Sequence, residues 1–177
     1  MTLYLVRHAM PAVDPATDPA TWPLGEPGLA AARALCKRLP PDALLLASDE
    51  PKAWQTLALG GERRVSRDRR LGEVRRVEEF SDDFRTLRRR YVTGETLPAF
   101  EPQPAVARRF AAAVADASRA AADGDVVLAS HGMAMTVWLD DAIGLADPGE
   151  FWAGLRFPDL LRVDLGARLV TRIPPPA

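Results

Sequence analysis

The chain has 177 residues, of which 47% are hydrophobic, a length that supports one well-buried core but is too short for two ordinary domains. Its formal net charge of -1, from 23 basic and 24 acidic side chains, gives no global electrostatic reason for binding nucleic acid or an anionic membrane. We therefore expect a single domain over residues 1–173, followed by a proline-rich tail at residues 174–177.

Cysteine content and hydropathy indicate the compartment. The only cysteine, Cys36, excludes an internal disulfide framework and is typical of a reducing environment. No stretch approaches the roughly 20 apolar residues that a membrane span needs, and the N-terminus has no basic leader. These features predict a cytoplasmic protein that does not associate with membranes.

The N-terminal part of the chain begins with a strand pattern. Residues 2–6 form a short apolar run that stops at Arg7 and His8, which predicts a buried strand. Residues 10–27 are rich in Pro, Asp and Thr without periodicity and predict a long loop, a feature that is often functional. Residues 28–39 place apolar side chains at helical spacing before two prolines, which predicts an amphipathic helix.

A second strand and helix follow. Residues 43–47 are another continuous apolar run and predict a buried strand. The next residues, Ser48 and Asp49, are candidate N-caps for a helix with Pro51 in its first turn. The glycines at 60–61 predict the end of this helix.

The middle of the chain is less regular. Residues 62–76 hold seven arginines and three acids and predict no clear element, whereas residues 79–93 have a polar helical pattern. Residues 104–122 carry apolar side chains along one helical face, which predicts an amphipathic helix. Residues 125–129 then predict a third buried strand, and residues 133–143 a helix.

The C-terminal region predicts two closing strands, at residues 160–165 and 169–173, in the form of a hairpin. Buried strands that alternate with helices predict the α/β class: a three-layer sandwich with a mostly parallel central sheet and helices on both faces. Ligands in such folds bind beyond the carboxyl ends of the strands.

The two histidines of the chain, His8 and His131, each follow the end of a predicted strand, so both could reach one crevice. As one alternative, each is only a hydrogen-bonded polar residue at a strand end. As a second, they bind a metal, but no third ligand stands at metal spacing. As a third, Ser130 beside His131 belongs to a Ser-His-Asp hydrolase, but the chain has no Gly-x-Ser-x-Gly turn.

Five segments carry a resemblance to a known family. Residues 5–9, Leu-Val-Arg-His-Ala, resemble the Arg-His-Gly signature of the histidine phosphatase superfamily, the phosphoglycerate mutase-like proteins, in its Arg-His-Ala variant. Residues 22–28 are similar to the stretch that opens the first helix of the family, with Gly25 at the usual position of a threonine. Residues 48–56 resemble the Ser-x-x-x-Arg-Ala-x-Gln-Thr segment, residues 71–73 the Leu-x-Glu motif, and residues 130–132 the second-histidine motif.

The resemblance implies the phosphoglycerate mutase-like fold and a role for five residues. His8 is the expected nucleophile, which forms a phosphohistidine that water hydrolyses. Arg7, Lys52 and His131 are expected to bind the phosphate of the substrate, because phosphoryl transfer needs fixed cations and donors around the equatorial oxygens. Glu73 is the expected general acid and base. No cofactor and no metal are expected.

Two of these positions depart from the family pattern. Lys52 stands where the family usually has an arginine, and a lysine keeps the charge but loses the planar fork that binds phosphate through two bonds. Glu73 lacks the glycine that commonly follows it four residues later, because Val77 stands there. The neighbouring Glu78 and Glu79 are alternative candidates for the acid, and an ordinary surface ion pair is an alternative role for Glu73.

The function expected from these residues is phosphatase activity on a phosphomonoester or a phosphohistidine. The substrate is then a small phosphorylated molecule, or a phosphoprotein, and neither nucleic acid nor a membrane is an expected partner. The arginines of residues 63–90 form either a positive rim around the pocket or a solvated face paired with acids, and we favour the second. A catalytically weak phospholigand-binding module and a mutase-type phosphotransferase are the alternative functions.

Overall fold

The computed structural model describes residues 2–77 and 83–174, so the candidate acids Glu78 and Glu79 lie outside the described residues. The strands are β1 (Leu3–Arg7), β2 (Leu44–Ala47), β3 (Val65–Arg67), β4 (Val126–Ser130), β5 (Asp159–Asp164) and β6 (Leu169–Arg172). The α-helices are α1 (Glu26–Cys36), α2 (Pro51–Ala58), α3 (Phe84–Val92), α4 (Gln103–Ala120), α5 (Gly132–Ile143) and α6 (Pro148–Ala153). Two short 3-10 helices are η1 (Pro19–Thr21) and η2 (Arg69–Leu71).

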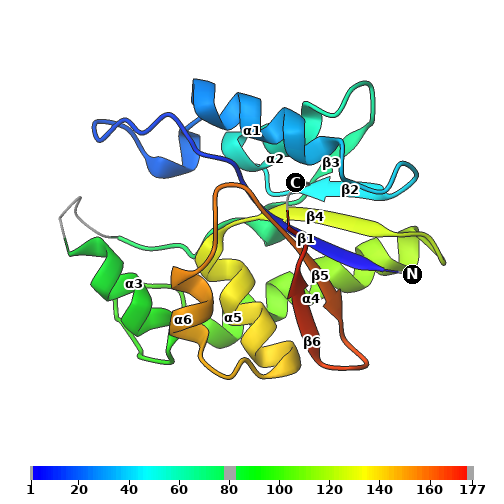
Figure 1. Cartoon of the computed structure of the whole chain (residues 1–177). Helices are drawn as coiled ribbons and strands as arrows, with labels where there is room; N and C mark the ends of the chain where they lie inside the picture. The colour runs from blue at the N-terminus through cyan, green and yellow to red at the C-terminus, as the bar shows by residue number, and fades with distance from the viewer. Residues whose placement is uncertain (1, 78–82, 175–177) are drawn as a thin grey trace.

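The central sheet has the strand order β3-β2-β4-β1-β5-β6. Strands β3, β2, β4 and β1 run parallel, whereas β5 pairs antiparallel with both β1 and β6. Helices α1 and α2 lie on one side of the sheet and α3, α4, α5 and α6 on the other (Figure 1). The structure thus has the predicted α/β fold with a mostly parallel sheet, and β5 and β6 form the predicted antiparallel hairpin.

The sheet separates two apolar layers because successive side chains of a strand point to opposite faces. Leu3 and Leu5 of β1 belong to the larger cluster, which includes Phe110 of α4 and Met135 of α5. Val6 of β1 faces the other way, into a smaller cluster with residues of α1 and α2. Burial on both faces explains why the strands have continuous apolar sequences instead of alternating ones.

Several boundaries differ from the prediction. Helix α1 begins at Glu26, two residues before the predicted start, because Pro27 fits the first helical turn. The N-cap of α2 is Glu50, so the predicted cap at Ser48 or Asp49 is wrong. Ser48 is buried and its hydroxyl lies against a ring nitrogen of His131 instead.

One strand and one α-helix were not predicted. Strand β3 has three residues of which only Val65 is apolar, so it shows too little pattern to be recognised before it pairs with β2. Helix α6 spans six residues and begins with a capping hydrogen bond from the Glu150 N–H to the Asp147 side chain. The polar helix expected over residues 79–93 is observed as α3; its predicted residues 79–82 lie outside the described part of the chain.

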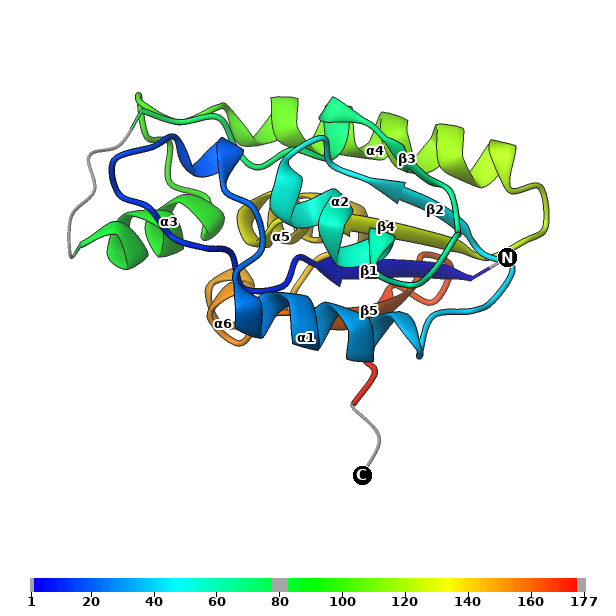
Figure 2. The same cartoon turned by 90° about the horizontal axis from the view of Figure 1, so that it is seen from above.

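The carboxyl ends of the parallel strands gather the long loops on one side of the molecule. The loop over residues 8–25 and helix α3 lie at this end, opposite the N-terminus (Figure 2). Among the described residues, no helix is long and apolar enough to cross a membrane.

Candidate active site

The two histidines meet where β1 and β4 end. The strands are adjacent and parallel, with Arg7 in register with Ser130, and the His8 N–H donates to the Ser130 carbonyl oxygen at 3.1 Å. The side chains of His8 and His131 therefore leave the same edge of the sheet, with their ring centroids 5.1 Å apart. Both residues are buried, and the pairing of β1 with β4 brings them together although they are far apart in the sequence.

The ring of His8 is held in one orientation and one tautomer. Its Nδ1 lies 2.7 Å from the carbonyl oxygen of Ala9, which can only accept a hydrogen bond, so Nδ1 carries the hydrogen. Nε2 then keeps its lone pair. Burial is the largest cause that lowers the pKa of His8 well below 6.5, and His131 and Lys52 lower it further. His8 is therefore a neutral imidazole with a free lone pair at neutral pH, the form needed for nucleophilic attack.

His131 presents its two ring nitrogens to different surroundings. Nε2 lies 2.9 Å from the Ser48 hydroxyl and 3.2 Å from Glu50 Oε1. Nδ1 is buried and has no hydrogen-bond partner among the described residues. Burial lowers the pKa of His131 to about 3 although the nearby Glu73 acts in the opposite direction, so the ring is neutral in the unliganded pocket at pH 7.

The guanidinium of Arg7 lies beside the histidines. Its Nη1 donates to the Leu155 carbonyl oxygen at 2.8 Å, and its carbon lies 3.5 Å from the ring centre of Phe157. Its Nε is buried without a partner among the described residues. Gly132 allows this approach, since a Cβ there would lie 3.4 Å from the guanidinium carbon and 3.1 Å from Trp152 Nε1. Burial lowers the pKa of Arg7 to about 10, so the group stays charged at neutral pH.

Lys52 enters the pocket from the first turn of α2. Its Nζ donates to the Pro19 carbonyl oxygen at 2.6 Å and to Glu50 Oε2 at 2.5 Å, and the side chain is 7% exposed. The Thr56 hydroxyl one turn later donates to the Lys52 carbonyl oxygen and accepts from the Ala9 N–H, which ties α2 to the loop after β1. Lys52 is thus near the histidines, but a carboxylate already pairs with its charge.

Glu73 lies against the N-terminus of α5. Its Oε1 accepts from the N–H groups of Val74 and Ala134, both at 2.9 Å, where unpaired helix N–H groups favour a negative charge. Burial by itself raises the pKa of Glu73, but His131, Arg76 and these two N–H groups outweigh it and lower the pKa to about 2. The carboxyl group is therefore ionised in the unliganded pocket.

Two site residues were missed by the sequence analysis. Glu50 links Lys52, His131 and the Glu73 N–H, which donates to Glu50 Oε1 at 2.7 Å. Arg109 of α4 donates to the carbonyl oxygens of residues 70, 72 and 73 and so fixes the backbone that carries Glu73. Neither belongs to a fixed position of the quoted motifs, so only their spatial contacts reveal them.

The loop over the pocket is held by the remaining motif residues. The Leu24 N–H donates to Gln55 Oε1 at 2.8 Å, which joins the loop to α2. A Cβ at Gly28 would lie only 2.1 Å from the Met10 carbonyl oxygen, so this position of α1 must be a glycine for the loop to pass over the helix. Leu24, Gln55 and Gly28 thus support the pocket from outside and do not line it.

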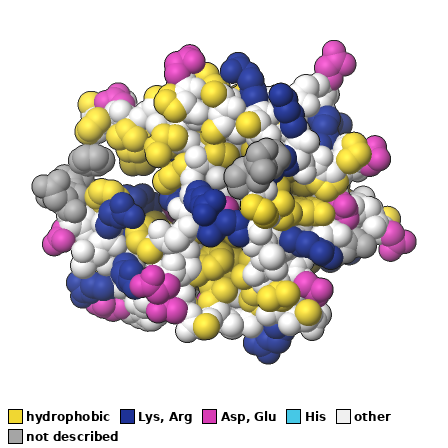
Figure 3. Space-filling model, in the orientation of Figure 1, with side chains coloured by type: hydrophobic (Ala, Val, Ile, Leu, Met, Phe, Trp, Pro, Cys, Tyr) yellow, Lys and Arg dark blue, Asp and Glu magenta, His cyan; other side chains and the backbone are white. Residues whose placement is uncertain are grey.

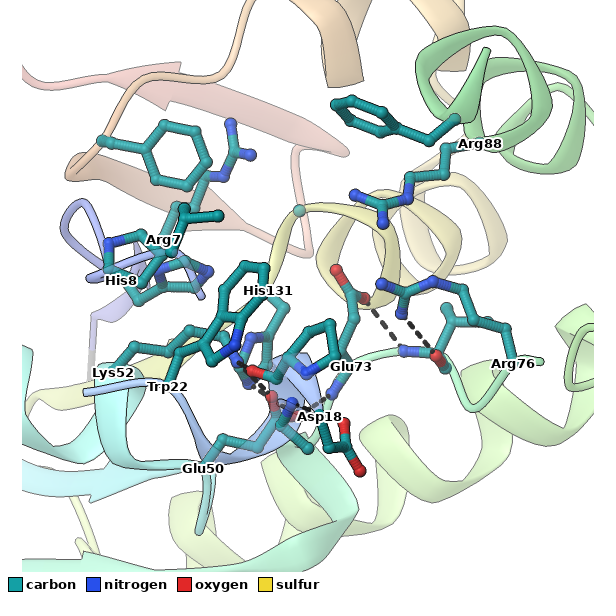
Figure 4. Close-up of a pocket in the computed structure, with 18 of the residues that line it drawn as sticks. Arg7, His8, Asp18, Trp22, Glu50, Lys52, Glu73, Arg76, Arg88 and His131 are labelled. Carbon is teal, nitrogen blue, oxygen red and sulfur yellow. Dashed lines mark hydrogen bonds and ion pairs between the residues drawn. The ribbon is translucent and has the colours of Figure 1, made fainter. Parts of the chain in front are cut away.

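Together these elements enclose a cavity of about 620 Å³. The five site residues predicted from the sequence, His8, His131, Arg7, Lys52 and Glu73, all line it. In Figure 4, Arg76 and Arg88 point toward Glu73, while Arg7 lies above His8. Among the described residues, no group of three or more His, Cys, Asp or Glu side chains is placed to hold a metal ion.

The entrance of the cavity combines apolar and basic surface. Its walls include Met10, Val13 and Phe157, which are 42%, 53% and 36% exposed, together with Arg75 and Arg88. In the space-filling view, apolar side chains gather over the loop at the upper left, and basic side chains lie below them (Figure 3). The arrangement suits an anion that carries an apolar group.

Solved structures share this architecture. A mycobacterial glucosyl-3-phosphoglycerate phosphatase, solved with VO3, is 21% identical with a TM-score of 0.71, and the match covers 92% of each chain. A putative alpha-ribazole-5'-P phosphatase from Escherichia coli K-12 is 19% identical with a TM-score of 0.67, covering 98% of this chain and 94% of that one. Bacillus stearothermophilus YhfR is 19% identical with a TM-score of 0.71, covering 92% and 91%.

Sequence comparison identifies the family. No curated protein matches the chain. Residues 3–156 match the family described as histidine phosphatase superfamily (branch 1), a span that contains β1, β4 and every residue of the pocket described above except Phe157. The chain therefore belongs to branch 1 of the histidine phosphatase superfamily.

Proposed function

We propose that the protein is a phosphatase that hydrolyses a small phosphomonoester through a phosphohistidine on His8. One observation carries this proposal: the lone pair of a neutral His8 stands beside two buried nitrogens, Arg7 Nε and His131 Nδ1, that have no hydrogen-bond partner among the described residues. Buried polar groups are rarely left unpaired, so an anionic ligand that accepts from Arg7 and pairs with His131 is their natural partner.

The reaction proceeds in two steps. In the first, His8 Nε2 forms a bond to phosphorus while the bond from phosphorus to the leaving oxygen breaks, and Glu73 gives that oxygen a proton. In the second, water attacks phosphorus, Glu73 takes a proton from it, and the bond from phosphorus to Nε2 breaks. Arg7, Lys52 and His131 stabilise the negative charge on the equatorial oxygens in both steps.

The ionised state of Glu73 sets a condition on this mechanism. With a pKa of about 2 in the unliganded pocket, the carboxyl group has no proton to give. A phosphoryl group bound between Arg7 and His131 adds negative charge close to Glu73, and a like charge raises the pKa of a carboxyl group. Substrate binding thus raises the pKa of Glu73 above its value in the unliganded pocket, which favours its action as an acid.

The walls of the cavity indicate the class of substrate. The phosphate is expected at the histidines, and the leaving group then lies between the loop residues Met10 and Val13 and the ring of Phe157, whose centre is 5.3 Å from that of His8. We propose a leaving group with apolar or aromatic surface, small enough for a cavity of about 620 Å³. The structural relatives support a phosphorylated small molecule, since one was solved with inorganic phosphate.

Trapping of the intermediate tests this function. Wild-type protein should hydrolyse p-nitrophenyl phosphate without added metal and in the presence of a chelator, and rapid acid-free quenching should show a phosphorylated His8 by mass spectrometry. His8→Asn, which keeps a polar side chain but has no nucleophilic nitrogen, should lose at least about a thousandfold in kcat and show no adduct. Full activity of His8→Asn, or phosphorylation at another residue, contradicts the proposal.

A second function is favoured by the pairing of Lys52 with Glu50. Because this carboxylate offsets one of the phosphate-binding charges, the pocket could serve as a phospholigand-binding module with little turnover. Tight binding of phosphate esters to the wild-type protein with no turnover over a broad panel of esters would support this function, and turnover with a phosphohistidine would exclude it.

A further inference from the structure

Glu50 connects three residues of the pocket. Its Oε1 lies 3.2 Å from His131 Nε2 and accepts from the Glu73 N–H at 2.7 Å, while its Oε2 binds Lys52 Nζ at 2.5 Å. The side chain is only 13% exposed. Figure 4 shows it beneath Trp22, next to the ring of His131. One side chain thus contacts three residues to which we assign catalytic or phosphate-binding roles.

The contact with Glu50 fixes the hydrogen on one nitrogen of His131. An ionised carboxylate only accepts hydrogen bonds, so a ring nitrogen that faces it must carry the hydrogen. The Ser48 hydroxyl oxygen lies 2.9 Å from the same nitrogen. One of its lone pairs faces the Glu50 N–H, and the second can accept a share of the hydrogen on His131 Nε2. In the neutral ring, Nδ1 then has a lone pair and cannot donate.

The lone pair on Nδ1 conflicts with phosphate binding. Nδ1 is the nitrogen of His131 that is buried without a partner among the described residues, and a phosphoryl oxygen placed there is also an acceptor. The contact becomes favourable only when Nδ1 gains a proton. An imidazolium between the Glu50 carboxylate and a phosphoryl oxygen donates one hydrogen bond to each of them.

From this geometry we infer that Glu50 is a positioning residue that makes His131 bind the phosphoryl group as an imidazolium, so that each dianion bound brings one proton into the pocket. The inference rests on the proposed function and deepens it, because it assigns the protonation state in which His131 acts. The positive charge on His131 then appears only when the ligand is bound.

Other groups facing His131 bear on where this proton goes. They are His8 from β1, Glu50 and Lys52 around the start of α2, Glu73 and Arg76 after η2, and Arg109 from α4. Of these, His8 is fixed with its hydrogen toward Ala9 and offers its lone pair to phosphorus, so it is not the acceptor of the proton. Glu73 is the competing acceptor, and the experiment has to separate it from His131.

A different role for Glu50 predicts the opposite result. If the carboxylate only competes with phosphate for Lys52, its removal strengthens anion binding and leaves the proton balance unchanged. In Glu50→Gln, by contrast, no negative charge faces His131 Nε2, so our inference expects the ring to stay neutral and the anion to bind without a further proton.

Calorimetry with tungstate tests the inference. Tungstate is tetrahedral and fully dianionic near about pH 7.5, so a proton taken up on binding goes to the protein. Titrations in two buffers of different ionisation enthalpy should give uptake of about one proton by wild type, and its Kd should fall about tenfold per unit decrease of pH. Glu50→Gln should take up almost no proton and show a nearly constant Kd.

Two control variants complete the experiment. Glu95→Gln removes an exposed carboxylate that pairs with Arg90 outside the pocket and should behave as wild type. Glu73→Gln should still take up the proton. The inference is overturned if wild type takes up no proton, or if Glu50→Gln binds tungstate more tightly than wild type. It is also overturned if proton uptake is lost in Glu73→Gln but kept in Glu50→Gln. A wild-type protein that binds no tungstate overturns the proposed function as well.

Discussion

The chemistry of the pocket depends on which ring nitrogen of each histidine carries a hydrogen. In His8 the Ala9 carbonyl oxygen places the hydrogen on Nδ1, which leaves Nε2 free to attack. In His131 the Glu50 carboxylate places it on Nε2, the opposite assignment. Two residues of the same type, 5.1 Å apart between ring centroids, thus receive different roles from their hydrogen-bond partners.

Arg7 should not tolerate replacement by lysine. Lysine keeps the charge but cannot bind the Leu155 carbonyl oxygen and a phosphoryl oxygen with a planar fork, nor stack on Phe157 in the same way. We expect Arg7→Lys to raise KM for p-nitrophenyl phosphate about tenfold or more, the loss of one charge-assisted hydrogen bond. Arg162→Lys, an exposed position of β5, is the matched control in steady-state kinetics. Equal KM values for the two variants would refute this role of Arg7.

Glu73 should matter most for poor leaving groups. An alkoxide needs a proton as it departs, whereas p-nitrophenolate is stable without one. Glu73→Gln should therefore lower kcat about a hundredfold or more for an alkyl phosphate and much less for p-nitrophenyl phosphate, as measured by phosphate release. Equal losses for both substrates would show that Glu73 does not donate the proton and would turn attention to another acid.

At the scale of elements, the pocket is positioned by strand ends and by one turn of α2. β1 and β4 present the histidines, while Lys52, Gln55 and Thr56 on successive turns bind the pocket and the loop that covers it. Within the loop lie η1 and one antiparallel bridge between Pro11 and Leu24. Its conformation depends on this bridge and on its contacts with α1 and α2.

Gly28 is the most sensitive of these contacts. The Cβ of an alanine there would overlap the Met10 carbonyl oxygen, at 2.1 Å, so the loop has to move away from α1. We expect Gly28→Ala to lower the free energy of unfolding by about 2 kcal/mol or more and to raise KM, because Met10 lines the cavity. Gly166→Ala, whose Cβ would make only an ordinary contact at 3.5 Å, is the control in urea unfolding. Similar losses in both variants would show that the close approach is not the cause.

At the scale of the whole molecule, the fold keeps two neutral histidines and the carboxylate of Glu73 largely away from water. His8 and His131 are both buried, at 6% and 0% exposure, at the edge of the sheet where β1 and β4 end. Ionisable groups in such places make stability depend on pH, because the unfolded chain binds protons that the folded chain does not.

Acidification should destabilise the protein. Burial holds the pKa of His131 at about 3 in the folded state against 6.5 in the unfolded state, so its contribution is lost as pH falls from about 6.5 toward 3. Glu73, with a folded pKa of about 2 against 4.5, acts in the same direction below about pH 4.5. From pH 7 to pH 4 the free energy of unfolding should drop by roughly 3 kcal/mol through His131. Urea unfolding checks this, and His131→Asn, which cannot titrate, should show a smaller drop; equal drops would contradict the assignment.

The sequence by itself predicts several strands and most residues of the candidate site. Continuous apolar runs predict β1, β2 and β4 because strands covered on both faces need apolar residues at every position. The ordered motifs predict five residues of the candidate site, because the expected phosphoryl transfer needs these residue types. They are Arg7, His8, Lys52, Glu73 and His131. Such features are local in the chain, and local patterns can be recognised without knowing the fold.

Other features of the fold and of the site depend on the tertiary structure. The pairing of β1 with β4 brings the histidines together, the short strand β3 forms only against β2, and Arg109 reaches the backbone of Glu73 from a distant helix. Glu50 is one acid among 24 in the sequence, and it becomes part of the site because its two oxygens lie within reach of Lys52 and His131. Contacts between residues far apart in sequence, set by packing, leave no local pattern, and here such a contact determines which nitrogen of His131 is free to act.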